Sequence, residues 1–513
     1  MKLKLYFLVF LTIYAISLMA QVSKSPEEVK QINLLHADVG RFDNVSGQSA
    51  QKLIGKVRAE HEGSLFFCDS AYLYDNNSID AFGQVHIIVN DTLDMYGDQL
   101  FYDGNIKVAE FYNNVRLVDK KATLYTDELI YDRNSGIGRY FVWGRIEDST
   151  NVLTSKKGYY YNQIETVYFK DSVVVINPDF VMKSDTLKYE TNTERVYFMG
   201  PSTIVGDSSY MYAESGFYDT QNQEARLSEN AFVQNKTNTI SGDSIFYSKE
   251  RGLSKVFRNV VMTDTANDVL VTGEFGVYNK AKFFAFMVDS AQAIFVDNGD
   301  SSFLHADTLM IRFDSIEKPE FLFAYNHMKF FSKDMQGMAD SLVYFFNDST
   351  LQFHSNPFLW FEDNQISCQR IDLISKNGEL DSASFQSDVF LVSQDTVEPR
   401  FYNQVSGKNM HAWFREGDMR KILMLGKSET LYFMWEEDGT PVGMNKIESK
   451  DMLIFLKDQQ LETITYIDKP TATLTPTQFV KASQEKLRGF IWKDDYRPRK
   501  RADIFRKEGE IEE

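Results

Sequence analysis

The sequence of 513 residues contains few cysteines, prolines or histidines. Its 2 cysteines cannot build the disulfide framework of a small secreted domain. Its 10 prolines argue against a disordered chain, because disordered segments are enriched in proline. The 7 histidines show no spacing typical of metal ligands. We therefore expect an ordered protein with no metal and no cofactor.

Basic residues are also in deficit, since 55 Lys and Arg face 73 Asp and Glu, for a formal net charge of −18. Nucleic-acid binding needs clustered Lys and Arg, and the chain offers no such cluster in its repeated part. A glycine-rich phosphate loop, a nucleophile elbow and a Ser/His/Asp set that the repeats would bring together are absent from the sequence as well. We expect neither a nucleic-acid partner nor an enzyme.

Long apolar runs are missing after the first twenty residues. Residues 1–20 carry Lys2 and Lys4, then an apolar stretch from Leu5 to Met19, and Ala20 could precede a cleavage site. This pattern predicts a secretory signal peptide over residues 1–20 and hence a periplasmic protein, and it leaves association with the outer membrane open. A single N-terminal membrane anchor stays the alternative.

The dominant positive feature is a tyrosine that returns about every 29 residues. It belongs to a short motif of a small residue, an acid, an apolar residue and the tyrosine. The clearest copies are Gly97–Asp103, Thr126–Asp132, Ser184–Glu190 and Gly242–Ser248. A fixed period of this length indicates one supersecondary unit stacked many times.

Within each unit the apolar residues alternate, which predicts strands. Leu100 and Tyr102 share one strand face, while Phe101 lies on the other. Turn residues and Gly/Asn/Asp steps divide each unit into two or three predicted strands of about five residues. We expect an all-β fold of stacked strand-turn-strand repeats.

The repeats also predict how the chain is organised. We expect an N-terminal lead-in over residues 21–35, regular repeats over 36–368, an irregular continuation over 369–478 and a charged C-terminal tail over 479–513. The tail, with the basic run Lys493–Arg501, is expected to be solvated or helical, with contact to a partner or anionic head groups as the alternative.

The motif accounts for the two cysteines and for the repeated acid. Cys68 and Cys368 both occupy the small-residue position that Gly97 fills elsewhere, so we do not expect a disulfide between them. An acid on the apolar face would be costly to bury. We expect it at a bend between strands, where its carboxylate can accept backbone N–H groups.

These motifs resemble the OstA/LptA family of lipopolysaccharide-transport proteins. The resemblance lies in Gly97-Asp98 with Leu100 and Tyr102, and in the first unit, where Leu53, Gly55 and Val57 form the pattern L-x-G-x-V. It implies an elongated β-jellyroll, or β-taco, with an apolar groove that binds the lipid A part of lipopolysaccharide. It also implies partners among other lipopolysaccharide-transport proteins, through strand-edge pairing at the jellyroll ends, and no catalytic residues.

The resemblance predicts a carrier or bridge that moves lipopolysaccharide toward the outer membrane. Its candidate groove residues are the inward apolar residue and the tyrosine of four repeats: Leu100, Tyr102, Leu129, Tyr131, Leu187, Tyr189, Ile245 and Tyr247. Each could instead be ordinary core. Two other functions stay open, namely a structural or adhesive β-solenoid scaffold with a filled interior, and a secreted β-solenoid enzyme that acts on polysaccharide.

Overall fold

A computed structural model describes residues 30–507, except residues 46, 90–92, 267, 298–299, 377–378, 417 and 458–459. The expected signal peptide over residues 1–20 lies outside the described residues, as do most of the lead-in and the last six residues of the tail. None of the helices in the described part is long and apolar enough to cross a membrane.

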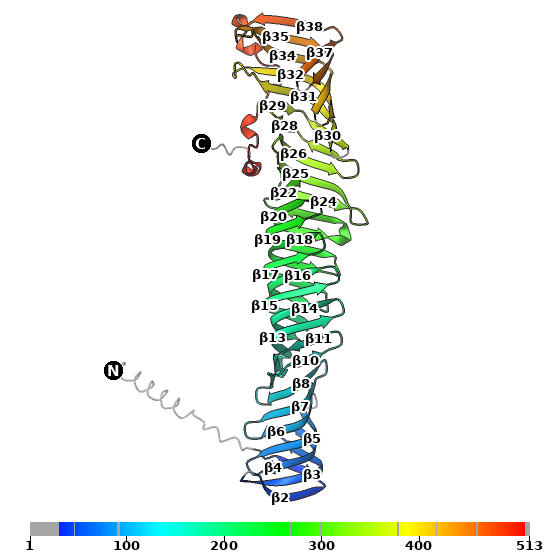
Figure 1. Cartoon of the computed structure of the whole chain (residues 1–513), viewed down its shortest axis with the longest axis vertical. Helices are drawn as coiled ribbons and strands as arrows, with labels where there is room; N and C mark the ends of the chain where they lie inside the picture. Colours follow the sequence, from blue (N-terminus) through cyan, green and yellow to red (C-terminus); the bar gives the residue numbers. More distant parts are fainter. Residues whose placement is uncertain are drawn as a thin grey trace, which may run out of the picture. The chain divides into compact units, whose positions relative to one another are not determined.

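The chain divides into two packed units. Unit 1 comprises Met1–Pro178 and Asp185–Asn192, and unit 2 comprises Asp179–Ser184 and Thr193–Glu513. Their boundary falls inside strand β14 (Phe180–Glu190). In both units the strands follow one another in chain order (Figure 1), and each described pairing of strands is antiparallel, as between β6 and β7.

Unit 1 contains thirteen further strands and one 3-10 helix in its described residues: β1 (Asn33–His36), β2 (Val39–Val45), β3 (Gln48–His61), β4 (Ser64–Tyr74), β5 (Ser78–Val89), β6 (Leu93–Asp103), β7 (Val108–Val118), β8 (Thr123–Asp132), β9 (Ile137–Tyr140), β10 (Gly144–Glu147), β11 (Val152–Ser155), β12 (Lys157–Tyr161), η1 (Asn162–Ile164) and β13 (Thr166–Asn177).

Unit 2 begins with the central strands β15 (Arg195–Gly206), β16 (Tyr210–Asp219), β17 (Glu224–Gln234), β18 (Asn238–Ser248), β19 (Leu253–Asp264), β20 (Val269–Asn279), η2 (Lys280–Lys282), β21 (Phe284–Val288), β22 (Gln292–Asp297), β23 (Asp300–His305), β24 (Thr308–Phe313), β25 (Pro319–Phe331) and β26 (Met335–Phe345).

Unit 2 continues with β27 (Thr350–His354), β28 (Phe358–Phe361), β29 (Asn364–Ser367), β30 (Arg370–Lys376), β31 (Glu379–Gln394), β32 (Tyr402–Arg415), β33 (Asp418–Leu425), β34 (Ser428–Trp435), β35 (Pro441–Ser449), β36 (Asp451–Lys457), β37 (Gln460–Ile467), β38 (Thr471–Pro476), η3 (Thr477–Phe479), η4 (Ala482–Gln484), η5 (Asp494–Tyr496) and η6 (Arg501–Phe505).

The all-β prediction is confirmed, but the predicted division into short strands is wrong. Strands such as β6 and β7 are 11 residues long. The Gly/Asn/Asp step does not end a strand. It lies inside β7 at Asn113 and Asn114, where the pairing register with β8 shifts between Tyr112 and Val115. One 29-residue repeat is therefore a hairpin of two long strands, of which the strand without the repeated tyrosine carries a bulge near its middle.

The bulge is built from two successive residues in the left-handed region. Asn113 has φ 62° and Asn114 has φ 51°. Glycine, asparagine and aspartate adopt this region at the lowest steric cost, which explains why they recur at the step. Equivalent pairs are Gly83-Gln84, Asp171-Ser172, Glu229-Asn230, Arg258-Asn259, Asn326-His327 and Ser387-Asp388.

Each bulge bends its strand at a corner and so divides the strand into two arms. Stacked arms form two walls. Wall A holds the repeated tyrosines and includes Leu100–Asp103, and wall B includes Leu93–Tyr96. The walls face each other, since the ring of Phe66 on wall B lies 5.1 Å from that of Tyr102 on wall A. This arrangement is a β-jellyroll, and side chains from both arms fill the space beside the corner.

The repeated acid lies at this corner, as expected. Its partner differs from the expectation, because the carboxylate accepts mainly from a side-chain amide of the next strand's bulge. Asn114 Nδ2 donates to Asp98 at 2.6 Å, and Asn259 Nδ2 donates to Asp243 at 3.0 Å. The acid thus ties neighbouring corners together while it stays exposed to water.

Both cysteines occupy the small-residue position and are free and buried. Burial raises the pKa of the Cys68 thiol to about 11 and that of Cys368 to about 12. Such thiols stay protonated near neutral pH and are poor nucleophiles.

The C-terminal tail is neither solvated nor an α-helix. Residues 477–507, which we call the strap, form four short 3-10 helices and lie along the outer face of wall B in unit 2 (Figure 1). Four outward-facing glutamines of that wall are at least 95% buried and hold the strap. They are Gln292, Gln336, Gln365 and Gln404.

The glutamines bind the strap in reverse order along the chain. Gln404 donates to Glu485 O and accepts from Leu487 N, each at 2.8 Å. Gln365 donates to Ile491 O at 2.7 Å and accepts from Lys493 N at 2.8 Å. Arg497 then donates to Gln336 at 2.8 Å, and Arg501 donates to Gln292 at 2.6 Å. Paired amide bonds of this kind satisfy the strap's backbone without a regular sheet.

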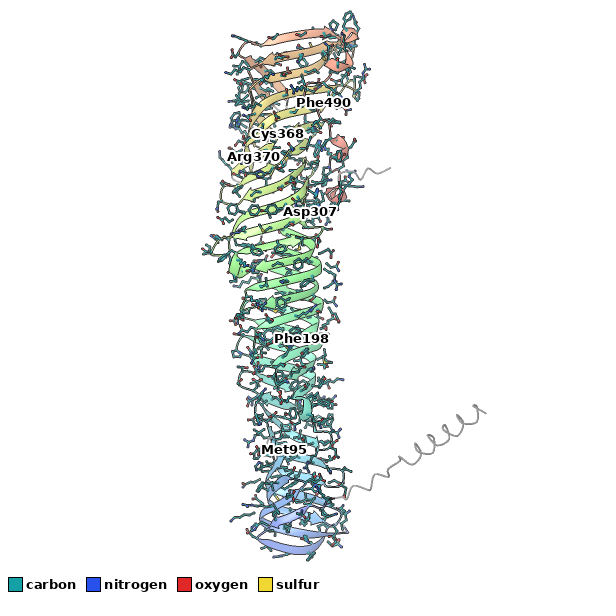
Figure 2. All side chains as sticks on the ribbon, turned by 180° about the vertical axis from the view of Figure 1, so that it is seen from behind. Met95, Phe198, Asp307, Cys368, Arg370 and Phe490 are labelled. Carbon is teal, nitrogen blue, oxygen red and sulfur yellow. The ribbon has the colours of Figure 1, made fainter. Side chains whose placement is uncertain are left out.

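Apolar residues of the strap complete a second core on the outer face. Leu487 is buried in a cluster with wall residues, and Phe490 and Trp492 pack against it (Figure 2 labels Phe490). The wall residues of this cluster are Phe390, Val392, Phe401, Leu431, Phe433 and Met444. The outer face of wall B is therefore buried in this part of unit 2.

We predict that Leu487→Ala weakens the strap's attachment. The side chain is 5% exposed, and truncating a buried leucine costs about 2–5 kcal/mol. Amide hydrogen exchange across the strap should speed up, and the denaturation midpoint should fall. Leu474→Ala is the matched control, because Leu474 on β38 is 54% exposed and its truncation should change stability by less than about 0.5 kcal/mol. Equal effects of the two changes would contradict a strap held by this core.

Candidate functional site

The candidate site is the space between the two walls. Side chains beside the corner are buried in both units, since Leu100 is 0% exposed and Leu129 and Ile245 are each 1% exposed. The two units differ at the arm ends, by which we mean the ends of the two arms that lie farthest from the corner. There the walls either close over the space or leave its side chains accessible to solvent.

In unit 1 the arm ends are closed by inward tyrosines, namely the repeated Tyr102 and Tyr189 and also Tyr160, which is inward where the 29-residue spacing predicts Tyr161. Tyr160 on wall A donates to Asp119, in the loop after β7 on wall B, at 2.6 Å. Tyr189 donates to Asp148, in the loop after β10, at 2.8 Å. Tyr102 bonds to His61 Nδ1 at 2.7 Å. Each of these hydrogen bonds crosses from one wall to the other, and we call them the tyrosine latches.

The latches are electrostatically well supported. Burial and the Asp119 carboxylate together raise the pKa of Tyr160, so this hydroxyl stays a donor. Burial alone would raise the pKa of Asp148, but hydrogen bonds from Thr150, Asn151 and Tyr189 outweigh it and lower that pKa. A neutral donor therefore faces an ionised acceptor, which is the stronger class of hydrogen bond.

Charged loops add to the closure of unit 1. Lys107, in a wall A loop, pairs with Glu62 of a wall B loop at 2.9 Å, and this hydrogen bond lowers the pKa of Glu62. Arg133 Nη1 donates to His61 O at 3.0 Å from the next wall A loop. Between these contacts the inward side chains Met95, Leu117 and Leu124 are all at most 3% exposed.

In unit 2, from β16 to β20, the inward apolar side chains at both arm ends are only half-buried. We call this region the accessible stretch. On wall A it contains Tyr218, Tyr247 and Tyr278. On wall B it contains Met211, Val233, Ile240, Met262 and Val271.

The tyrosines of the accessible stretch do not form latches like those of unit 1. Tyr278 donates to Glu317 at 3.1 Å, but Glu317 belongs to a loop of the same wall. Lys249 and Asp179 form an ion pair between loops at 3.0 Å, with both side chains about half exposed. An exposed pair of this kind contributes at most about 1 kcal/mol. Solvent thus reaches apolar side chains on two facing walls above a dry corner.

The eight residues predicted from sequence divide unevenly between these regions. Six lie on inward positions of unit 1 and are buried to at least 97%. Ile245 is in unit 2 but sits beside the corner, and it too is buried. Tyr247 alone among the eight has substantial exposed surface at an arm end. Their contact with lipid stays a prediction.

Sequence reasoning missed the wall B side of the accessible stretch. Met211, Ile240 and Val271 each lie two residues before the small-residue position of their repeat. Extending the alternation backward past that position would have placed them inward. The motif directed attention only to residues after the acid.

Among residues 30–507 as described, no group of three or more His, Cys, Asp or Glu side chains could hold a metal ion.

The chain is similar to the solved structure of LptH from Pseudomonas aeruginosa. LptH is described as the LptA homologous periplasmic component of the conserved lipopolysaccharide transport device. The two chains are 14% identical, and the match covers 21% of this chain and 74% of LptH with a TM-score of 0.19. A score of this size does not by itself establish a shared structure. No curated protein matches the chain.

The family whose model matches is described as OstA-like protein. The matches run over residues 29–185 and 181–304. Together they span 276 of the 513 residues, and they include the latched repeats and the accessible stretch. The chain therefore belongs to the OstA-like protein family.

Proposed function

We propose that this protein is a non-enzymatic periplasmic carrier that shelters the acyl chains of lipopolysaccharide between its two walls. The observation that carries the proposal is the accessible stretch, where apolar side chains of both walls are half-exposed above a dry corner. Exposed apolar surface that is continuous over several strands is typical of a ligand-binding or interaction site. The lipid's polar head would stay in water at the arm ends.

The energetics suit a sliding lipid. Each methylene removed from water contributes about 0.8 kcal/mol of favourable free energy. Burying one acyl chain of a dozen carbons between the walls is therefore favourable by on the order of 10 kcal/mol. A repeated wall offers nearly the same shelter at each strand. Small differences between neighbouring positions would let the lipid move without a large barrier.

Unit 1 favours a second role, that of a structural support. Its interior is filled and its arm ends are latched, which is the arrangement expected of a scaffold rather than of an open groove. In the proposed carrier, unit 1 would either remain closed or open when the tyrosine latches break.

We also propose partners at the outermost strands. β1 and β2 pair with β3, and β37 and β38 pair with β36 and β35, respectively. Exposed apolar residues accompany these edges, including Phe42 at 84% exposure. Unpaired strand edges readily add a strand from another chain. Other lipopolysaccharide-transport proteins are the partners that this proposal expects.

We predict that photo-crosslinking residues placed at Ile240 and Tyr247 capture lipopolysaccharide in cells. Both side chains face the accessible stretch from opposite walls. The matched control is Phe246, which neighbours Tyr247 but points to the outer face of the same arm. Adducts at Ile240 and Tyr247 should exceed those at Phe246 and at the buried positions Leu100 and Leu129. Equal adducts at Phe246, or none at Ile240 and Tyr247, would argue against transport between the walls.

We predict that breaking two latches opens unit 1. The double change Tyr160→Phe and Tyr189→Phe removes two hydrogen bonds to carboxylates, each worth about 1.5–3 kcal/mol. A crosslinking residue at Tyr131 should then capture more lipid than it does in the parent protein. Tyr278→Phe is the control, since its bond to Glu317 joins parts of one wall. Unchanged capture at Tyr131 would mean that the latches do not limit lipid entry.

A further inference from the structure

One strand of unit 1 is interrupted by three exposed apolar residues. Between β9 and β10 lie Phe141, Val142 and Trp143, which are 43%, 38% and 56% exposed. Equivalent corners of this unit carry small or polar residues, such as Asn113-Asn114. Three consecutive exposed apolar side chains on a paired sheet are a poor choice for stability alone and mark an interaction surface.

The backbone holds Trp143 firmly while its side chain points to solvent. Its N–H donates to Lys156 O at 3.0 Å, and its carbonyl accepts from Thr126 Oγ1 at 2.9 Å. Its φ is 47°, a conformation that is uncommon for a bulky residue. Hydrogen bonds on both sides hold the backbone in this conformation, which directs the indole toward solvent.

Trp143 borders an open groove of about 940 Å³ in unit 1. The groove combines aromatic rings with charged and amide groups on the outer side of the corners of β4 to β8 and of the segment between β9 and β10. Its lining includes Tyr96, Asp98, Asn114, Arg116, Tyr125 and Asp127. Ligand sites in proteins have this size and this mixture of apolar surface and few polar groups.

The polar and aromatic lining is held in place before any ligand binds. The rings of His86 and Tyr96 stack at 4.3 Å with planes 6° apart. The Arg116 guanidinium lies 4.3 Å from the centre of the Tyr96 ring. Asn114 donates to Asp98, which fixes both side chains. Groups that are already ordered lose little entropy on binding.

We propose that this groove binds an oligosaccharide of pyranose rings. A pyranose ring has an apolar face of C–H groups, which matches the exposed faces of Trp143 and Tyr125. Its rim carries hydroxyls that both donate and accept, which matches a lining of carboxylates, an amide and a guanidinium. The volume of the groove admits a short chain of sugar rings.

Other ligand classes fit the groove less well. An extended peptide needs a free strand edge, but the strands that border the groove pair on both sides, as β6 does with β5 and β7. Nucleic acid would face Asp98 and Asp127 on a chain of net charge −18. An acyl chain would remove Asp127 and Arg116 from water and offer them no hydrogen bond in return, which is costly for charged groups.

The test is calorimetric titration of the full chain with two probes, cellotetraose and tetra-N-acetylchitotetraose. We expect at least one probe to bind and Trp143→Ala to weaken its binding by about tenfold or more. Arg116→Ala should weaken it as well, and Trp143→Phe should retain part of it because an aromatic face remains. Trp413→Ala is the matched control, since Trp413 is an exposed tryptophan of unit 2 outside the groove and 37% exposed.

The proposal is overturned if neither probe binds. It is also overturned if the Trp143→Ala variant keeps the parent's unfolding midpoint and binds the probe as tightly as the parent does. The outcome is separate from that for lipid transport. Lipid adducts at Tyr247 should persist in Trp143→Ala, because the groove lies on the outer side of unit 1 and the accessible stretch lies between the walls of unit 2.

Discussion

The whole architecture depends on one backbone constraint, the pair of left-handed residues at the middle of one long strand in most hairpins. Two residues such as Asn113 and Asn114 drop out of the pairing and turn the strand. Repetition of this bend at a fixed spacing turns a single antiparallel series into two facing walls. The amide bonds from these bulges to the repeated acids join one corner to the next. Every inward side chain owes its position to this bend.

The two units close the same architecture in different ways. Unit 1 uses tyrosine hydroxyls that reach from one wall to loops of the other, with charged loops beside them. The strands at the start of unit 2 leave the corresponding tyrosines half-exposed, and later strands are braced from outside by the strap. The inward tyrosine therefore bonds the two walls together in unit 1, whereas in unit 2 it lines the accessible stretch. The difference arises from the loop it can reach, not from the tyrosine itself.

Much of the fold could be predicted from the sequence, because alternation and a fixed period are local properties. Leu100 and Tyr102 are inward as expected, and the cysteines occupy the small-residue position. The corner was mistaken for a strand end, since Asn113-Asn114 resembles a turn when its pairing is unseen. The accessible stretch depends on the separation of the walls, which no residue pattern encodes. The strap was missed because Gln365 and Gln404 stand at outward positions, where amides usually meet water.

The strap follows, in chain order, every strand that it covers. During synthesis, the strands of wall B emerge before residues 477–507, which cover the outer face of this wall. Trp360 and the glutamines, fully or almost fully buried in the finished protein, are then exposed to water and to other chains. Final consolidation of this wall must wait until the last part of the chain arrives. A chain that stops before residue 477 would leave this apolar surface uncovered, and uncovered apolar surface promotes aggregation and proteolysis.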